Sequence, residues 1–244
     1  MPFTQILDAI REKGYHDHRS NSHSNLLTER MVADLAATCP SFVADRAANR
    51  FREWRNTLGP DRRNTDLLIG AANADGSPGL RNVRILIEHK SVVTAHRNRN
   101  AHYQDIEREM LATHDKNPRT IVVATLIVGV CQRVLNVPDC VKKDSRYSPI
   151  RFQNEILPRL STGDQTVWTD FPRCISTNTP EDPATTVAMF RGLPVRAPAD
   201  SHEVGLDFML FVPVEIDNVN PPRLGVMDGI DSIADYQRMI QHIC

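Results

Sequence analysis

The chain has 244 residues, of which 41% are hydrophobic and 24% charged, and its 29 basic and 30 acidic side chains give a formal net charge of -1. This composition excludes a disordered chain, and the charge balance excludes a protein that is basic overall. No apolar run approaches the roughly 18 residues of a membrane span, and the polar N-terminus lacks the apolar stretch of a secretory signal. We therefore expect a cytoplasmic protein with no membrane association, folded as a single domain over 1–244.

The cysteines support an intracellular location. They are odd in number, widely spaced and without a C-x-x-C pair, which favours reduced thiols over disulfides or a structural zinc site. They are Cys39, Cys131, Cys140, Cys174 and Cys244.

Two helices are predicted near the N-terminus, over 3–13 and 26–37, with a polar stretch over 14–25 between them. That stretch is rich in histidine, but the spacing matches no familiar metal site, so we expect a surface loop. A longer helix is predicted from Ser41. It carries an apolar stripe at helical spacing, formed by Ala47, Phe51, Trp54 and Leu58.

A hairpin is predicted next, because two apolar runs over 65–70 and 83–87 flank a segment rich in turn-forming residues. If the hairpin is symmetric about Ser77, Gly70 lies opposite Arg84 and Asp66 lies opposite Glu88, with Cβ atoms about 5 Å apart. Strand alternation predicts that Val83, Ile85 and Ile87 face a core. Glu88 and Lys90 then emerge together on the other face, and His89 points away from them.

The remaining elements follow in order. We expect a helix from about Asn98 or Asn100 to Thr113, and a central strand over 120–130 that is apolar on both faces and therefore covered by helices on each side. The proline-rich stretch 136–199 is expected to be irregular, with a short helix near 150–160. A strand over 206–216 and a helix over 233–243 complete the chain. This predicts an α/β fold with a central mixed sheet, organised as N-terminal helices (1–40), a core (41–130) and an elaboration (131–244).

Asp66, Glu88 and Lys90, an acid on one strand followed by acid-x-lysine on the next, resemble the PD-(D/E)xK nuclease superfamily, which includes many restriction endonucleases. The resemblance covers roughly 46–128, in the order helix, strand, strand, helix, strand. One position departs from the family pattern, because Thr65 replaces the proline that often precedes the first acid. The resemblance implies a restriction-endonuclease-like core with Asp66, Glu88 and Lys90 as catalytic residues, and Glu53 from the preceding helix as a candidate additional acid.

The expected chemistry is hydrolysis of a phosphodiester bond. Asp66 and Glu88 would hold Mg²⁺, with Mn²⁺ as an alternative, and a backbone carbonyl near His89 is a plausible third ligand. Lys90 would orient the attacking water or neutralise developing charge. The resemblance favours a type II restriction endonuclease that acts on double-stranded DNA as a homodimer; whether a partner methyltransferase accompanies it is left open by the sequence.

Basic residues bracket this motif. Six arginines against two acids occupy 46–63, and five basic residues against one acid occupy 81–100. A phosphate backbone would require such charge. The candidate DNA or phosphate contacts are Arg84, His96, Arg97, Asn98, Arg99 and Asn100.

Other interpretations stay open. A repair nuclease or junction resolvase would have the same core but cut by structure rather than by sequence. A non-catalytic DNA-binding protein of the same fold would keep the carboxylates without turnover. In a plain α/β interaction protein, Glu88 and Lys90 would form only a surface ion pair, worth about 0 to 1 kcal/mol. A thiol hydrolase that uses a cysteine with His96 or His202 has no supporting local motif.

Overall fold

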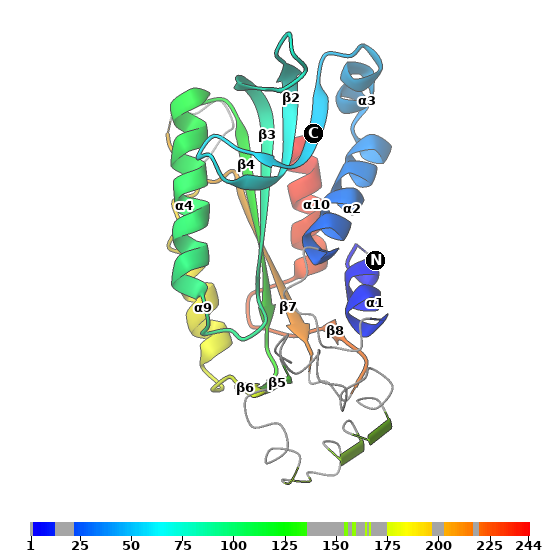
Figure 1. The fold of residues 1–244 in the computed structure, drawn as a ribbon, viewed down its shortest axis with the longest axis vertical. Coiled ribbons are helices and arrows are strands. Elements are labelled where there is room, and N and C mark those ends of the chain that lie inside the picture. The colour runs from blue at the N-terminus through cyan, green and yellow to red at the C-terminus, as the bar shows by residue number, and fades with distance from the viewer. Residues whose placement is uncertain are drawn as a thin grey trace.

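The computed structural model describes residues 2–12, 22–135, 175–196, 203–216 and 220–244, with a few isolated positions between 154 and 166. Six strands form one mixed sheet in the order β1-β2-β3-β4-β7-β8, and β5 and β6 pair separately (Figure 1). The strands are β1 (Arg52–Leu58), β2 (Asn64–Ala72), β3 (Pro78–Val92), β4 (Ile121–Gly129), β5 (Arg133–Leu135), β6 (Ile175–Thr177), β7 (Phe208–Glu215) and β8 (Arg223–Leu224). The helices of the described residues are α1 (Thr4–Glu12), α2 (Ser22–Thr38), α3 (Pro40–Ala47), α4 (Arg99–Lys116), α9 (Asp182–Phe190) and α10 (Ser232–Ile243).

The sheet changes from antiparallel to parallel at β3. β1, β2 and β3 form an antiparallel meander, whereas β3, β4 and β7 run parallel. The parallel pair β3 and β4 requires a crossover connection, which α4 supplies. The expected α/β fold with a central mixed sheet is therefore confirmed.

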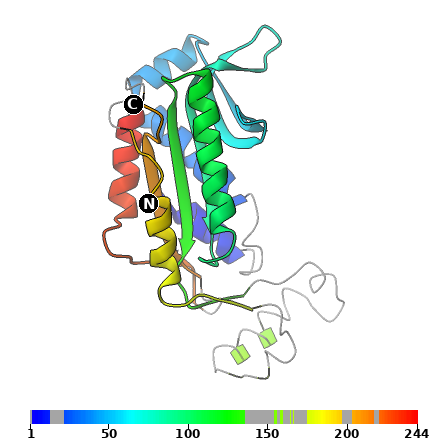
Figure 2. The same cartoon turned by 90° about the vertical axis from the view of Figure 1, so that its left-hand side faces the viewer.

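Helices cover both faces of the sheet (Figures 1 and 2). On one face α4 and α9 enclose a core that includes Leu68, Leu86 and Phe190. On the other face α1, α2 and α10 enclose a second core. β4 lies between the two cores and is buried at eight of its nine positions, as the strand predicted over 120–130 requires.

The long helix predicted from Ser41 is wrong. α3 ends at Ala47, and Asn49 adopts a left-handed backbone with φ of 52°. Asparagine in this conformation just beyond a helix is a stop signal, because the turn it forms satisfies the last carbonyls of the helix. The amide of Asn49 accordingly donates to the carbonyl of Arg46. The chain then turns into β1, so Trp54 and Leu58 belong to an edge strand rather than to a helical stripe.

The hairpin has the predicted register next to the candidate site and a different one further out. Leu67 lies opposite Ile87 and Ile69 opposite Ile85, which confirms symmetry about Ser77 over this stretch. Gly70, however, lies opposite Val83 and not Arg84, because the register shifts at this point. Such a bulge reverses the facing of the residues beyond it. Val83 consequently packs in the α4-side core while Ile85 and Ile87 pack in the other core, so the shared facing predicted for these three is wrong.

The later elements agree with prediction except in the proline-rich region. The strand expected over 206–216 is β7, and the helix expected over 233–243 is α10. α9 and the β5–β6 pair were not predicted, because the prolines of this stretch suggested irregular chain. Pro183 in fact occupies the first turn of α9, where a proline is tolerated. The short helix expected near 150–160 falls almost entirely outside the described residues.

A buried ion pair fastens the chain between α9 and β7 to the start of β4. The guanidinium of Arg196 contacts the Asp207 carboxylate at 2.9 and 3.0 Å, and both side chains have no exposed surface. Arg196 also donates to the carbonyls of Pro118 and Thr120, both at 2.5 Å, and Asp207 accepts from the amide of Val122 at 2.8 Å. Every charge-bearing group of the pair is thus hydrogen-bonded.

Replacing Arg196 by alanine should destabilise the fold by about 3 to 5 kcal/mol, because Asp207 would remain buried without its cation. Urea denaturation measures this change. Arg223→Ala, which removes an exposed pair with Glu215, is the matched control and should cost less than about 1 kcal/mol. Equal losses for the two variants would show that the buried pair has no special role.

Candidate functional site

Asp66, Glu88 and Lys90 meet on the α4 face of the sheet, as predicted. The Lys90 ammonium lies 2.5 Å from Glu88 Oε1. The second oxygen of Glu88 accepts from the Asp66 amide at 3.4 Å, and the Asp66 carboxylate accepts from the His89 amide at 2.7 Å. These bonds cross between β2 and β3, so the hairpin register itself places the two carboxylates and the lysine together.

The positive charge of Lys90 does not fully offset the burial and mutual repulsion of the Asp66 and Glu88 carboxylates. Burial and the nearby Asp66 carboxylate raise the pKa of Glu88 to about 7, despite the opposing effect of Lys90. Burial alone would lower the pKa of Lys90, but the attraction of Glu88, Asp105 and Asp66 outweighs it and raises that pKa. Lys90 is therefore charged at neutral pH, while Glu88 is close to half protonated.

α4 adds residues that the sequence analysis did not select. Asp105 lies 3.7 Å from the Lys90 ammonium, and it also pairs with Arg63 and with Arg108. Glu109, one turn further along, accepts a hydrogen bond from the Thr65 hydroxyl at 2.7 Å. Asp105 and Glu109 are spaced i, i+4 beside the buried Ile106 and Met110. This spacing, in the helix that follows the motif, was the available sequence signal for a second row of acids.

The β1–β2 turn closes against Glu109. Burial and a hydrogen bond with Asp61 raise the pKa of Glu109 to about 9, so this side chain is a neutral acid at pH 7. A side chain at Gly59 would collide with the Thr65 hydroxyl and with the Glu109 carboxyl, so the turn needs glycine here. The turn, α4 and the strand that carries Asp66 are thereby joined through one carboxyl group.

His89 points away from this face, as strand alternation predicts. Its side chain is buried, and neither ring nitrogen has a hydrogen-bond partner among the described residues. Thr125, its neighbour across the β3–β4 register, is also buried with an unpartnered hydroxyl. Burial lowers the pKa of His89, which keeps the ring neutral. His89 therefore contributes to the site through its main chain only.

Glu53 is not part of this site. It lies on β1 rather than on a helix, opposite Ile69, and so it shares the face of Ile69 and not that of Asp66. Its carboxylate is bound by Arg46 at 3.4 Å and by Arg55 at 3.9 Å. The prediction of Glu53 as an additional acid rested on the helix that the structure replaces with β1.

The predicted phosphate contacts lie at the start of α4, next to α9. His96 Nδ1 and Arg99 approach Asp182 at 3.3 and 3.9 Å. Asn98 is the N-cap of α4 but makes no side-chain capping bond, while Arg97 and Asn100 are exposed. Arg84 is engaged by Asp45 on α3. No hydrogen bond or ion pair of these side chains that the structure describes reaches Asp66, Glu88 or Lys90.

The donor set suits a hard divalent cation only in part. Asp66 and Glu88 supply two carboxylates, which Mg²⁺ and Mn²⁺ accept together with water and main-chain oxygens. Within the described part of the chain, no group of three His, Cys, Asp or Glu side chains is placed to hold a metal. Burial first, and the neighbouring Asp66 carboxylate second, raise the pKa of Glu88, and a bound cation would favour the ionised carboxylate.

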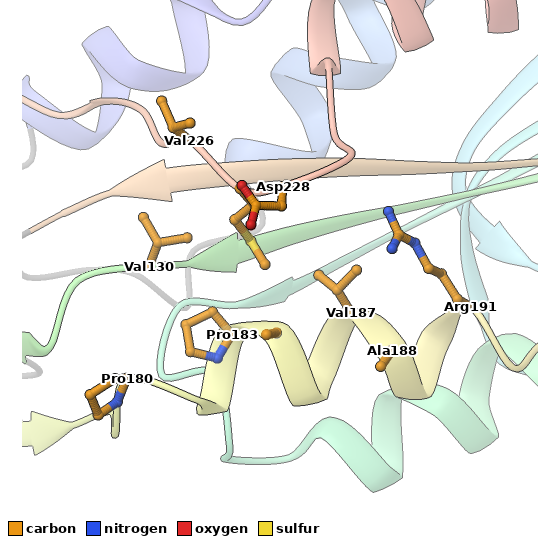
Figure 3. A pocket seen from close by; sticks show the side chains of 10 residues that line it. Val130, Pro180, Pro183, Val187, Ala188, Arg191, Val226 and Asp228 are labelled. Carbon is orange, nitrogen blue, oxygen red and sulfur yellow. The ribbon is translucent and has the colours of Figure 1, made fainter.

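A surface pocket lies elsewhere, against α9 and the chain that follows β8 (Figure 3). Its volume is about 380 Å³, and its lining includes Pro183, Val187, Arg191, Val226 and Asp228. The pocket includes none of the clustered carboxylates, so we place the candidate site at Glu88 on chemistry rather than on concavity. The three cysteines in the described residues, Cys39, Cys131 and Cys244, are free thiols.

Comparison of the chain with protein-family models, with curated proteins and with solved structures finds no match. None of the helices in the described residues is both long enough and apolar enough to cross a membrane.

Glu109→Gln should stabilise the protein increasingly as the pH rises. The pKa of Glu109 is raised from 4.5 to about 9 by folding, so its stabilising effect is complete below pH 4.5 and is lost as the pH approaches 9. Glutamine keeps the hydrogen bonds without the ionisation. We expect a gain of about 1.4 kcal/mol for each pH unit above 4.5, up to several kcal/mol at pH 8, and almost none at pH 4.5, measured by thermal unfolding across this range. Glu107→Gln on the same helix is the control, and a pH-independent effect of Glu109→Gln would contradict the assignment.

Proposed function

We propose that this protein is a metal-dependent endodeoxyribonuclease, most simply a type II restriction endonuclease that acts on duplex DNA as a homodimer. The observation that carries the proposal is the meeting of two strand-borne carboxylates and a charged lysine on one face of a hairpin. Of the element order that the PD-(D/E)xK resemblance implies, the two strands, the helix and the last strand correspond to β2, β3, α4 and β4, whereas β1 stands where most of the first helix was expected and α3 ends at Ala47.

The residues divide the chemistry between them. Asp66 and Glu88 would hold Mg²⁺, which when bound lowers the pKa of a coordinated water and polarises the phosphoryl group. Lys90 does not act as a base, because its raised pKa keeps it protonated at neutral pH. The Lys90 ammonium instead stabilises negative charge that develops on the phosphoryl oxygens, in a partly buried setting where such an interaction is strong. Asp105 holds the ammonium from the α4 side, so Lys90 keeps an acidic partner if Glu88 binds a cation.

A plain α/β interaction protein would also contain a Glu88–Lys90 ion pair. The burial of Glu88 favours the nuclease proposal over this alternative, because an exposed ion pair would not raise the pKa of its own carboxylate to about 7. A structure-selective repair or junction nuclease, and a non-catalytic DNA-binding protein of the same fold, have the same site. The substrate and the metal dependence of cleavage separate them.

Glu88→Ala and Lys90→Ala should each reduce cleavage by at least about 100-fold. Glu88→Ala removes a metal ligand, and Lys90→Ala removes the positive charge that stabilises the transition state. The assay follows unmethylated phage and plasmid DNA with Mg²⁺ and with EDTA, and branched DNA tests the structure-selective alternative. Lys116→Ala on α4, which removes an exposed lysine, is the matched control. Discrete Mg²⁺-dependent fragments that persist in Lys90→Ala would overturn the role of the lysine. No cleavage of any substrate would favour the DNA-binding protein.

Metal binding should depend on pH. Because Glu88 has a pKa of about 7 and must lose its proton to bind a cation, the apparent affinity for Mn²⁺ should fall about tenfold for each pH unit below 7. Calorimetric titration of Mn²⁺ at pH 6, 7 and 8 measures this dependence, and Glu88→Gln should abolish the pH dependence. An affinity that does not change between pH 6 and 8 would exclude Glu88 as a ligand.

A further inference from the structure

The arginines around the candidate site fall into two groups, those with a carboxylate partner and those without one among the described residues. Of the ten arginines in the two basic segments, six have a carboxylate partner: Arg46, Arg50, Arg55, Arg63, Arg84 and Arg99. The structure records no ion pair or side-chain hydrogen bond, in the residues it describes, for Arg52, Arg62, Arg81, Arg97 and Arg119, and all five are exposed. Charge available to a polyanion therefore resides in a smaller set than the sequence suggests.

Three of these free arginines gather around one row of the sheet. Arg52 lies opposite Gly70, and Gly70 lies opposite Val83, two residues beyond Arg81. The carbonyl of Val83 accepts hydrogen bonds from the side chains of Asn117 and Thr120, which flank Arg119. The hairpin end and the C-terminal end of α4 indeed lie at the same end of the molecule (Figures 1 and 2).

The local acids do not cancel this charge. Asp45, the nearest acid on α3, is engaged by Arg50 and Arg84. Asp75 in the hairpin turn is exposed and accepts hydrogen bonds from Ser77. It contributes one negative charge near the three positive charges of Arg52, Arg81 and Arg119. The surface formed by Arg52, Arg81 and Arg119, here called the arginine surface, is thus net positive although the chain as a whole is not.

The arginine surface lies along the sheet from the carboxylates at a distance that can be expressed in base pairs of DNA. Gly70, in its row, is four residues along β2 from Asp66, which corresponds to about 13 Å at 3.3 Å per residue. Phosphates of one DNA strand recur every 3.4 Å along the helix axis, so this separation spans about four base pairs. Arg52 also lies on the same face of the sheet as Asp66, because Glu53 next to it lies on the opposite face.

We propose that the arginine surface binds the phosphate backbone of duplex DNA about four base pairs from the scissile bond. This rests on the proposed function for the position of the scissile bond, whereas the binding itself does not. Arg52, Arg81 and Arg119 hold the duplex by charge alone, independent of sequence, and so they set affinity and alignment rather than specificity. Of the residues first expected to fill this role, Arg84 is engaged by Asp45, whereas the residues from His96 to Asn100 lie at the other end of α4, where His96 and Arg99 approach Asp182.

The test is binding of a fluorescent 30-base-pair duplex in EDTA, measured by anisotropy from 50 to 200 mM KCl. The triple variant Arg52→Gln, Arg81→Gln, Arg119→Gln should bind at least tenfold more weakly, and the slope of log affinity against log salt should fall by about 2 to 3, because each phosphate contact contributes about 0.9. Arg238→Gln, which removes an arginine of α10 paired with Asp235, should change neither quantity. Thermal unfolding verifies that the triple variant is folded.

Each outcome separates this proposal from the nuclease proposal. Loss of binding in the triple variant, with wild-type binding retained by Glu88→Ala, supports the arginine surface whether or not the protein cleaves DNA. Wild-type binding in the triple variant, or loss only in Arg97→Gln, overturns the arginine surface while leaving cleavage to be judged on its own assay. A wild-type chain that binds no duplex at 50 mM KCl overturns it as well.

Discussion

The register between β2 and β3 is the constraint on which the candidate site depends. A slip of one residue would send Asp66 or Glu88 to the opposite face, because strand side chains alternate. The register is fixed on both faces at once, since Leu67 and Ile87 pack in one core while Leu68 and Leu86 pack in the other. Apolar packing one and two residues away from Asp66 and Glu88 therefore places the two carboxylates together.

Burying several carboxyl groups close together costs free energy, and nearby cations and bound protons reduce this cost. Glu88 and Asp105 both contact the Lys90 ammonium, and Asp105 also pairs with Arg63 and Arg108. Glu109 avoids the cost by keeping its proton. α4 thus places Asp105, which pairs with cations, a single turn from Glu109, which burial keeps neutral.

The sequence predicted the parts of the fold that depend on local pattern. β4 was evident from an apolar run on both faces, and the hairpin from its turn residues. β1 was missed because Phe51, Trp54 and Leu58 mimic helical spacing, and only Asn49, which stops α3, marks the true boundary. Asp66, Glu88 and Lys90 could be found because their spacing is short. Asp105 and Glu109 reach the site through a crossover, which a linear motif does not encode. The bulge beside Gly70 is marked only by a glycine within the strand, where a side chain would collide with the main chain of Asn82 and Val83.

The ion pair of Arg196 and Asp207 has a topological consequence. Its two members stand on either side of a short connection, and both are also tied to the chain around the start of β4. The ends of that connection are consequently held in place without the covalent link between them. A break in the chain between Arg196 and Asp207 would therefore leave both of these residues attached to the start of β4.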